Sequence, residues 1–333
     1  MHAAALPRVA VAALIVTLAG CDKNGSSPTT VRGRSAPLAL RTPTARTTSI
    51  RQRVAAKRHQ GLTSDERARV AAAGGKWKWA GDLHHQAMQQ AIHDPALHGL
   101  RGQHSAAERC AVALDYARKF GPAAERQIGH PMAPATVQEA SLKSGLAQEG
   151  LCESGPKQAS IFAAAPTPTF RVTPPAATAV TAANRATAQQ LADGYGDYLN
   201  AMLADLQGAK DLADANDIMD HYVAAAQEDA ALGATGAALV AGTIDLARSS
   251  AQEWDDFARP REGSMFLWGW LSAIGDWIVS VVTSDIYGCA WGVGFELGTM
   301  ADYGFYGTLD EFVEETAGYC AAFGIASSIG AAF

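Results

Sequence analysis

The chain has 333 residues, of which 48% are hydrophobic and 18% are charged, and its formal net charge is -6. This balance excludes a disordered acidic chain and a protein with many membrane spans. Glycine and proline are too few and too aperiodic for collagen, and five cysteines are too few for a small disulfide-dense scaffold. The length accommodates one large domain or two small ones.

The first twenty residues have the features of an export signal. Arg8 carries the only formal side-chain charge among them, and a short apolar run extends from Val9 to Gly20. A run of twelve residues is too short to cross a hydrocarbon core of about 30 Å as a helix. A basic start, a short apolar core and small residues at the end are typical of a secretory signal peptide.

The signal ends in the sequence Leu18-Ala19-Gly20-Cys21. These four residues resemble the lipobox of bacterial lipoproteins, which implies that residues 1–20 are removed and that Cys21 is acylated. Acyl chains on Cys21 would anchor the protein to a membrane. The resemblance implies a place in the bacterial cell envelope, facing the periplasm or the exterior. Ordinary cleavage beside an incidental Cys21 is the alternative, and the choice between inner and outer membrane stays open.

A basic segment follows the signal. Residues 22–60 hold nine Lys or Arg and one acid, Asp22, among many Ser, Thr and Ala. We expect residues 21–60 to form a disordered tether, because little apolar periodicity is present to fold them. Positive charge beside a lipid anchor suits anionic headgroups. Because the chain is exported, we expect no nucleic-acid partner.

Capping boxes predict helices in residues 61–153. In such a box, a Ser or Thr hydroxyl and the Glu carboxylate three residues later satisfy two free backbone N–H groups. Two consecutive helices joined by a short loop fold as an antiparallel hairpin, which we expect near the end of this region. The predicted starts are Thr63, Ser105 and Thr136, and the predicted ends are Gly74-Gly75, Gly121-Pro122 and Gly150.

Helix punctuation also predicts how the cysteines pair. Without Cys21, four cysteines remain, and an exported protein lies where disulfides persist. Cys110 is near the start of the first hairpin helix and Cys152 follows the end of the second, so their sulfurs would meet at the open end of the hairpin. Cys289 and Cys320 flank a second predicted turn in the same way. We predict the pairs Cys110–Cys152 and Cys289–Cys320, with buried free thiols as the alternative.

The remaining chain divides into a linker and an acidic bundle. Residues 154–181 contain five prolines and predict an extended linker. Residues 182–333 carry 22 acids and five bases, and apolar residues recur there at helical spacing. Three amphipathic helices are predicted between Leu191 and Pro260, and short breaks between them favour an antiparallel bundle.

The last seventy residues allow two interpretations. The segment Met265–Ser284 is almost continuously apolar, and the glycines at 288, 292, 294 and 298 permit close helix packing. These helices form either a buried hairpin in the core of the bundle or a segment that inserts into a membrane. We favour the core, because Asp276 would cost about 3 kcal/mol in a bilayer and no Lys or Arg follows Arg261.

Five histidines fall within 21 residues and are the candidate metal ligands. Imidazole is a common ligand of transition metals, but no HExxH motif or His-x-x-x-His pair is present. We therefore favour exposed polar histidines and expect no cofactor. The metal candidates are His84, His85 and His93, and His98 and His104 follow a predicted helix break at Asp94-Pro95.

Two groups of acids complete the candidates. Aspartates recur every third residue and resemble a hard-cation site, but the EF-hand glycine and glutamate are absent, so a solvated helix face is the favoured interpretation. Carboxyls within apolar sequence have raised pKa values and often mark functional sites, although no nucleophile or phosphate-loop motif accompanies them. The first group is Asp211, Asp214, Asp217 and Asp220, and the second is Asp276, Glu296 and Asp302.

We therefore expect an all-α protein, with a helical hairpin region over 61–153 and a C-terminal helical bundle over 182–333. The expected function is that of a lipid-anchored envelope protein that binds or scaffolds without catalysis, with the membrane and an envelope protein as partners. One alternative is a membrane-active helical effector that uses residues 264–333. Another is a hydrolase or metal-binding protein whose site has no recognisable motif.

Overall fold

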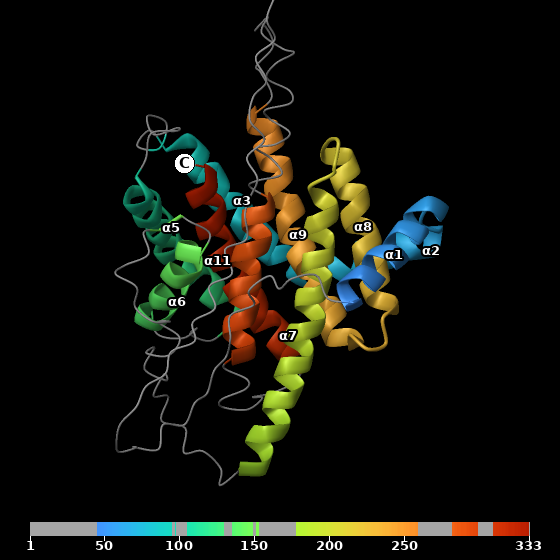
Figure 1. Ribbon diagram of the computed structural model, residues 1–333. Helices are drawn as coiled ribbons and strands as arrows, with labels where there is room; N and C mark the ends of the chain where they lie inside the picture. Colours follow the sequence, from blue (N-terminus) through green and yellow to red (C-terminus); the bar gives the residue numbers. More distant parts are fainter. Residues whose placement is uncertain are drawn as a thin grey trace, which may run out of the picture. The chain divides into compact units, whose positions relative to one another are not determined.

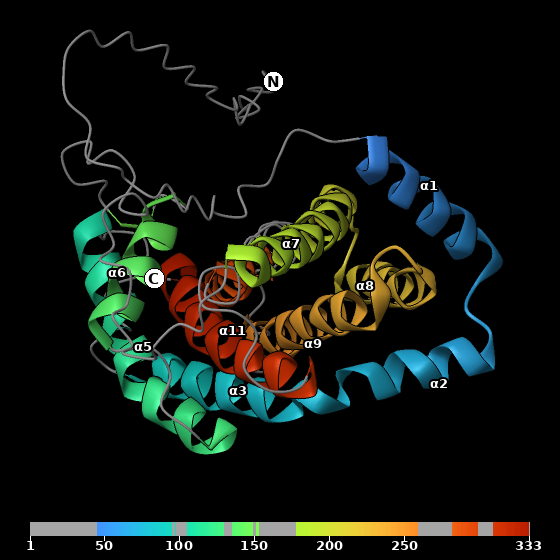
Figure 2. The ribbon, with the colours of Figure 1, turned by 90° about the horizontal axis from the view of Figure 1, so that it is seen from below.

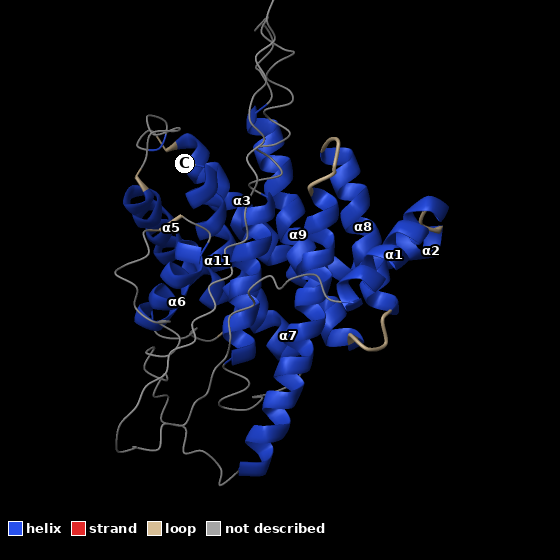
Figure 3. Cartoon of the chain, viewed as in Figure 1, coloured by secondary structure: helices blue, strands red, loops and turns tan. Residues whose placement is uncertain are grey.

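A computed structural model describes residues 45–94, 97, 105–129, 135–148, 151–152, 178–258, 282–298 and 309–332 (Figure 1). All regular elements in these ranges are helices, with no strand among them, which confirms the all-α prediction (Figure 3). A helix without a label in Figure 1 covers residues 282–298. The other helices are α1 (Ala45–Gln60), α2 (Ser64–Ala73), the 3-10 helix η1 (Gly74–Trp77), α3 (Lys78–His93), α5 (Ala106–Ile128), α6 (Ala135–Gln148), α7 (Thr178–Leu206), α8 (Leu212–Glu228), α9 (Gly233–Ala258) and α11 (Leu309–Ala332).

Two of the predicted capping boxes are confirmed. The backbone N–H of Glu66 donates to Thr63 Oγ1 over 3.2 Å, and Glu66 Oε2 accepts from the Thr63 N–H over 2.7 Å. Ser105 and Glu108 form the same reciprocal pair at the start of α5. These bonds satisfy N–H groups that have no partner inside the helix.

Two predicted helix ends are wrong. Helix α5 continues through Pro122 to Ile128 and ends at Gly129, whose φ of 80° is left-handed. Pro122 has no N–H, so the helix lacks one internal hydrogen bond at this point. Burial of Phe120 and Ala124, on either side of Pro122, keeps the segment helical. Helix α6 begins at Ala135, so Thr136 lies within its first turn and is not the residue before it.

The predicted tether is also wrong over its last sixteen residues, since residues 45–60 form α1. Helix α7 begins at Thr178, so the end of the predicted proline-rich linker is helical as well. The leader over 1–20, residues 21–44 of the predicted tether and most of the linker lie outside the described residues.

Helix α11 packs against α5, α3 and α9, and Figures 1 and 2 show it between α5 and α9. Every residue from 316 to 330 is buried. One cluster of buried apolar side chains includes residues of α1, α3, α5 and α11. The hairpin region and the C-terminal bundle therefore share one hydrophobic core.

Close packing between α11 and the 282–298 helix depends on glycine. A Cβ at Gly288 would lie 2.5 Å from the carbonyl oxygen of Phe323, and a Cβ at Gly292 would lie 2.6 Å from the backbone carbon of Tyr319. Both distances are well below a normal carbon contact. The close approach predicted for these two glycines is confirmed.

Candidate functional site

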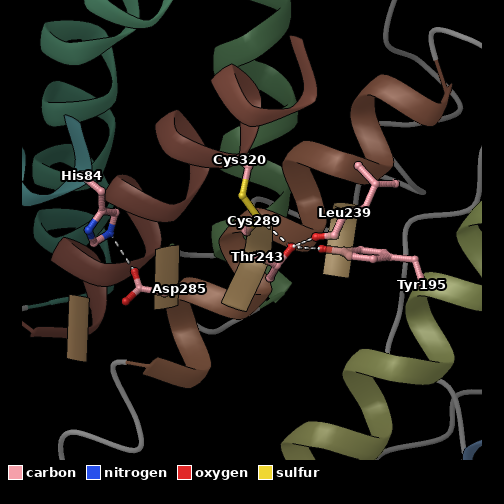
Figure 4. Close-up of a disulfide and its surroundings, with 7 residues drawn as sticks. All are labelled: His84, Tyr195, Leu239, Thr243, Asp285, Cys289 and Cys320. Carbon is pink, nitrogen blue, oxygen red and sulfur yellow. Dashed lines mark hydrogen bonds and ion pairs between the residues drawn. A yellow bond between two sulfur atoms is a disulfide. The ribbon is translucent and has the colours of Figure 1, made fainter. Parts of the chain in front are cut away.

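A buried pair of ionisable side chains joins α3 to the 282–298 helix. His84 Nε2 lies 3.0 Å from Asp285 Oδ1, and both side chains are 0% exposed (Figure 4). Helix α3 buries His84 because it shares a face with Ala80, Ala87 and Met88. Gly324 of α11 lies next to the ring, and a Cβ there would be in ordinary contact with His84 Cδ2 at 3.7 Å but would lie only 2.7 Å from Leu246 Cδ2.

Two kinds of interaction shift the pKa of Asp285 in opposite directions. Burial raises the pKa of Asp285, and the nearby His84 ring together with the hydroxyls of Ser250 and Ser328 opposes that rise. The two hydroxyls come from α9 and α11, and their oxygens lie 3.3 Å apart. Four helices thus contribute one polar residue each to a single buried cluster, which we call the His84 cluster: His84, Ser250, Asp285 and Ser328.

The His84 cluster contains the residue types of a catalytic triad in a different order. A triad places the carboxylate on one imidazole nitrogen and the nucleophile on the other. Here Asp285 lies at Nε2, whereas His84 Nδ1 has no hydrogen-bond partner within the described part of the chain. Ser250 and Ser328 act on the carboxylate and not on the ring. This geometry can hold a charge or a proton on Asp285 in the buried space between the four helices.

A second buried polar chain lies beside the Cys289–Cys320 pair. Thr243 Oγ1 lies 2.7 Å from the Tyr195 hydroxyl, 3.1 Å from Cys289 Sγ and 2.8 Å from the Leu239 carbonyl oxygen, to which it donates (Figure 4). Burial raises the pKa of the Tyr195 hydroxyl well above its usual range. Because Asp285 and Cys289 are one helical turn apart, both polar groups lie along the same helix.

The structure places both predicted cysteine pairs at disulfide distance. Cys110 and Cys152 are bonded with their Cα atoms 4.6 Å apart, and Cys289 and Cys320 are bonded between the 282–298 helix and α11. Cys152 follows the end of α6, as the hairpin geometry requires. Cys21 lies outside the described residues.

Of the predicted buried carboxylates, Glu296 is described and is buried on the 282–298 helix. Burial, with the negative charge of Glu315 nearby, raises the pKa of Glu296 to about 8. Its Oε2 atom has no hydrogen-bond partner among the described residues. Asp276 and Asp302 lie outside those residues.

The histidine prediction is wrong for one member. His84 is fully buried, because its spacing from other buried residues places it on the inner face of α3, whereas His85 and His93 on the same helix are exposed. His98 and His104 are not described. Across the described ranges, no group of three His, Cys, Asp or Glu side chains is placed to hold a metal ion.

The aspartate row lies on a solvent-accessible face of α8, as the sequence predicts, but it also makes ion pairs that the sequence analysis did not foresee. Asp211 caps α8 by accepting from the Asp214 N–H over 2.8 Å. Asp214 and Asp217 bind the guanidinium of Arg58, and Asp220 binds that of Arg248. Three of the four aspartates are therefore paired with cations from α1 and α9, and the fourth caps the helix.

Arg58 belongs to a larger contact that the sequence analysis missed, which we call the α1 interface. Every Lys and Arg of α1 pairs with a carboxylate, and all but one of these carboxylates lie between positions 197 and 229. Arg53 Nη2 is 2.9 Å from Asp229 Oδ2, and Arg51 Nη2 is 2.6 Å from Asp205 Oδ1. The other pairs are Arg46 with Asp197 and Asp229, Lys57 with Glu66 and Glu228, and Arg58 with Asp214 and Asp217.

Tyrosines of α7 and α8 extend the α1 interface. The Tyr198 hydroxyl donates to Asp229 Oδ2 over 3.1 Å, and that of Tyr222 donates to Asp205 Oδ2 over 2.6 Å. Burial raises the pKa of Asp229, but the bonds from Arg53 and Tyr198 outweigh it and hold the pKa below its usual range. A signal for this contact was present in the sequence, because Thr47, Ile50 and Val54 are spaced for one helix face and are the buried residues of α1.

Among the described helices, none has both the length and the apolar character needed to cross a membrane. The comparisons give no family assignment, since no protein-family model, curated protein or solved structure matches this chain.

Proposed function

We propose that this protein is a lipid-anchored component of the bacterial cell envelope that binds or scaffolds a partner without catalysis. The lipobox-like sequence ending at Cys21 places the anchor at the mature N-terminus, and the helical body faces the periplasm or the exterior. The membrane is one partner, and an envelope protein is the other.

The observation that carries the proposal is the complete pairing of the other four cysteines. Both pairs lie at disulfide distance in the structure, so only Cys21 is left for acylation. Disulfides persist in oxidising compartments and are rare in the bacterial cytosol. This cysteine usage supports export and fits the role assigned to Cys21.

The packing of the C-terminal region supports a binding body over a membrane-active effector. Residues 316–330 of α11 are buried on all sides by other helices of the same chain. A helix that is apolar on all faces is stable when it is buried in such a core. The buried groups of the His84 cluster contact one another across four helices of the same chain, which supports a structural role for them.

The mass of the intact protein purified from its native envelope tests the anchor and the pairing together. We expect a chain that starts at residue 21, carries acyl chains, and lacks four hydrogens relative to the fully reduced form. The Cys21→Ser variant is the control and should lack the acyl mass. An unmodified thiol at Cys21, or a mature chain that keeps residues 1–20, would contradict the anchor.

Photo-crosslinking in living cells tests the binding role. A crosslinking residue introduced at exposed positions of α2, α3 and α5 should yield discrete adducts with an envelope protein. The same residue at a buried position, such as Ala87, is the control and should yield none. The absence of an adduct from every exposed position would contradict a binding or scaffolding role.

A further inference from the structure

Helix α1 is attached to the described body through one short connection. Residues 61–63 join it to α2, and Gly61 adopts a left-handed φ of 75° with open space around its Cα. The main packing contacts of α1 are with α7 and α8, which follow it by more than 130 residues. Figure 2 shows α1 and α2 on the outer side of α8. The helix is therefore an arm that lies on a distant part of its own chain.

The arm makes more ion pairs than buried apolar contacts. Only Thr47, Ile50 and Val54 of α1 are buried, whereas all five of its cations are paired with carboxylates. Partly exposed ion pairs each contribute about 0.2–1 kcal/mol and weaken in salt. A contact of this kind opens more easily than one made by apolar burial.

We propose that α1 exchanges between copies of this protein, so that the arm of one copy docks on the α7–α8 face of another. The reciprocal exchange forms a two-fold symmetric dimer. This inference rests on the proposed scaffolding role, for which it names the partner as a second copy, and it does not require the lipid anchor.

A second copy is the partner that the contacts favour. The helix shown to match the carboxylates of α7 and α8 is α1, and each copy of the protein carries it. Exchange rebuilds the same ion pairs in the new position, so its cost is the entropy of association and the reopening of residues 61–63. Copies held on a membrane would have a high effective concentration, which offsets that entropy.

The ion pair between Lys57 and Glu66 would stay within one chain after exchange. Lys57 contacts both Glu66 of α2 and Glu228 of α8. Glu66 lies directly after the connection, whereas Glu228 belongs to the docking face. Exchanged copies would therefore keep the pairs to Asp205, Asp214, Asp217, Glu228 and Asp229, but each would take them from its partner.

Two charge-reversed variants test the exchange. The arm variant carries Arg51→Glu and Arg58→Glu, and the face variant carries Asp205→Lys and Asp217→Lys. Each is prepared as residues 21–333 with Cys21→Ser and both disulfides formed. Within either variant the arm and the face repel each other, but the arm of each variant matches the face of the other.

Light scattering during size-exclusion chromatography gives the readout. We expect each variant alone to be a monomer, and an equimolar mixture to form a heterodimer with twice the monomer mass. A mixture in which both variants remain monomeric would overturn the exchange. Circular dichroism of each variant checks that the helices are retained.

A peptide measurement keeps the test decisive if the face variant does not fold. A synthetic peptide of residues 45–60 stands in for the arm of a second copy, and the arm variant supplies a native face. We expect saturable binding that weakens at least about tenfold between 50 mM and 500 mM salt, and no binding of the peptide with reversed charges. A native-sequence peptide that does not bind would also overturn the exchange. An acylated Cys21 found together with monomeric mixtures would reject the exchange and leave the anchor in place.

Discussion

Different forces hold helices α1 and α11 in place. Helix α1 buries three side chains and pairs every Lys and Arg with a carboxylate. Helix α11 is buried throughout residues 316–330 and is bonded to the 282–298 helix through Cys320. One helical body thus combines a helix buried on all sides with an edge helix that pairs its cations with carboxylates.

The two regions also respond to pH in opposite directions. Carboxylates of the α1 interface have lowered pKa values: backbone and Arg58 hydrogen bonds lower that of Asp214, and those from Arg53 and Tyr198 lower that of Asp229. Their contribution to stability is present above the unfolded pKa and is lost as pH falls through the folded pKa. Asp285 and Glu296 have raised pKa values, so they stabilise the core at low pH and lose that contribution as pH rises.

The largest effect is expected from breaking the His84 cluster. Replacement of Asp285 by Ala leaves a buried imidazole without its partner and should reduce the free energy of unfolding by about 3–5 kcal/mol. Urea denaturation measures the loss. Asp82→Ala is the control, because Asp82 forms an exposed pair with Lys78 one turn away and should cost less than about 0.5 kcal/mol. Equal losses in the two variants would show that the buried pair does not stabilise the core.

A smaller loss is expected from Gly292→Ala. The new Cβ would lie 2.6 Å from the Tyr319 backbone, so α11 and the 282–298 helix must separate, at a cost of about 1–3 kcal/mol. The matched control is Gly75→Ala in η1, where no atom beyond the neighbouring residues and the local helix backbone lies within 4 Å of the added carbon. That control should stabilise the protein by up to about 1 kcal/mol. If both substitutions stabilise, the close packing of the two helices is wrong.

Glu296→Gln should change the pH dependence of stability. The native protein should lose on the order of 2 kcal/mol between pH 4.5 and about pH 6.5, because the folded state binds the Glu296 proton more tightly than the unfolded state. The variant should lack this loss, whereas Glu314→Gln, at an exposed position of α11, should keep it. Thermal unfolding at a series of pH values measures the difference, and parallel curves for all three proteins would contradict the assignment.

The smallest effect is expected at the α1 interface. Arg58→Gln should cost about 0.5–1 kcal/mol at low salt and close to nothing at 1 M salt, because salt screens its pairs with Asp214 and Asp217. Arg67→Gln on α2 removes an exposed cation and should be neutral in both conditions. A cost that persists in high salt would mean that packing, and not charge, holds the arm.

Local sequence signals predicted much of the helical framework. The capping boxes at Thr63 and Ser105 span three residues, and the two cysteine pairs and the close approach at Gly288 and Gly292 each link neighbouring helices no more than 42 positions apart. Their geometry follows from helix periodicity and short connections, and the structure confirms these features.

Contacts between distant residues account for what the sequence analysis missed. His84 and Asp285 are 201 positions apart, and Arg53 and Asp229 are 176 apart. Helix α1 looked like a tether because its apolar stripe has only three members and its charges are neutralised by α7 and α8. The row of aspartates in α8 predicted a solvated face, and its spacing alone does not identify Arg58 as a partner.

Hydrogen exchange measured by mass spectrometry tests most directly whether charge holds α1 and burial holds α11. Peptides covering residues 45–60 and 316–330 are compared at 50 mM and 1 M salt, at one pH where the fold is intact. We predict that protection of α1 falls at least about tenfold in high salt while that of α11 is unchanged. Equal protection of α1 in both salts, or a parallel loss in both helices, would contradict the account.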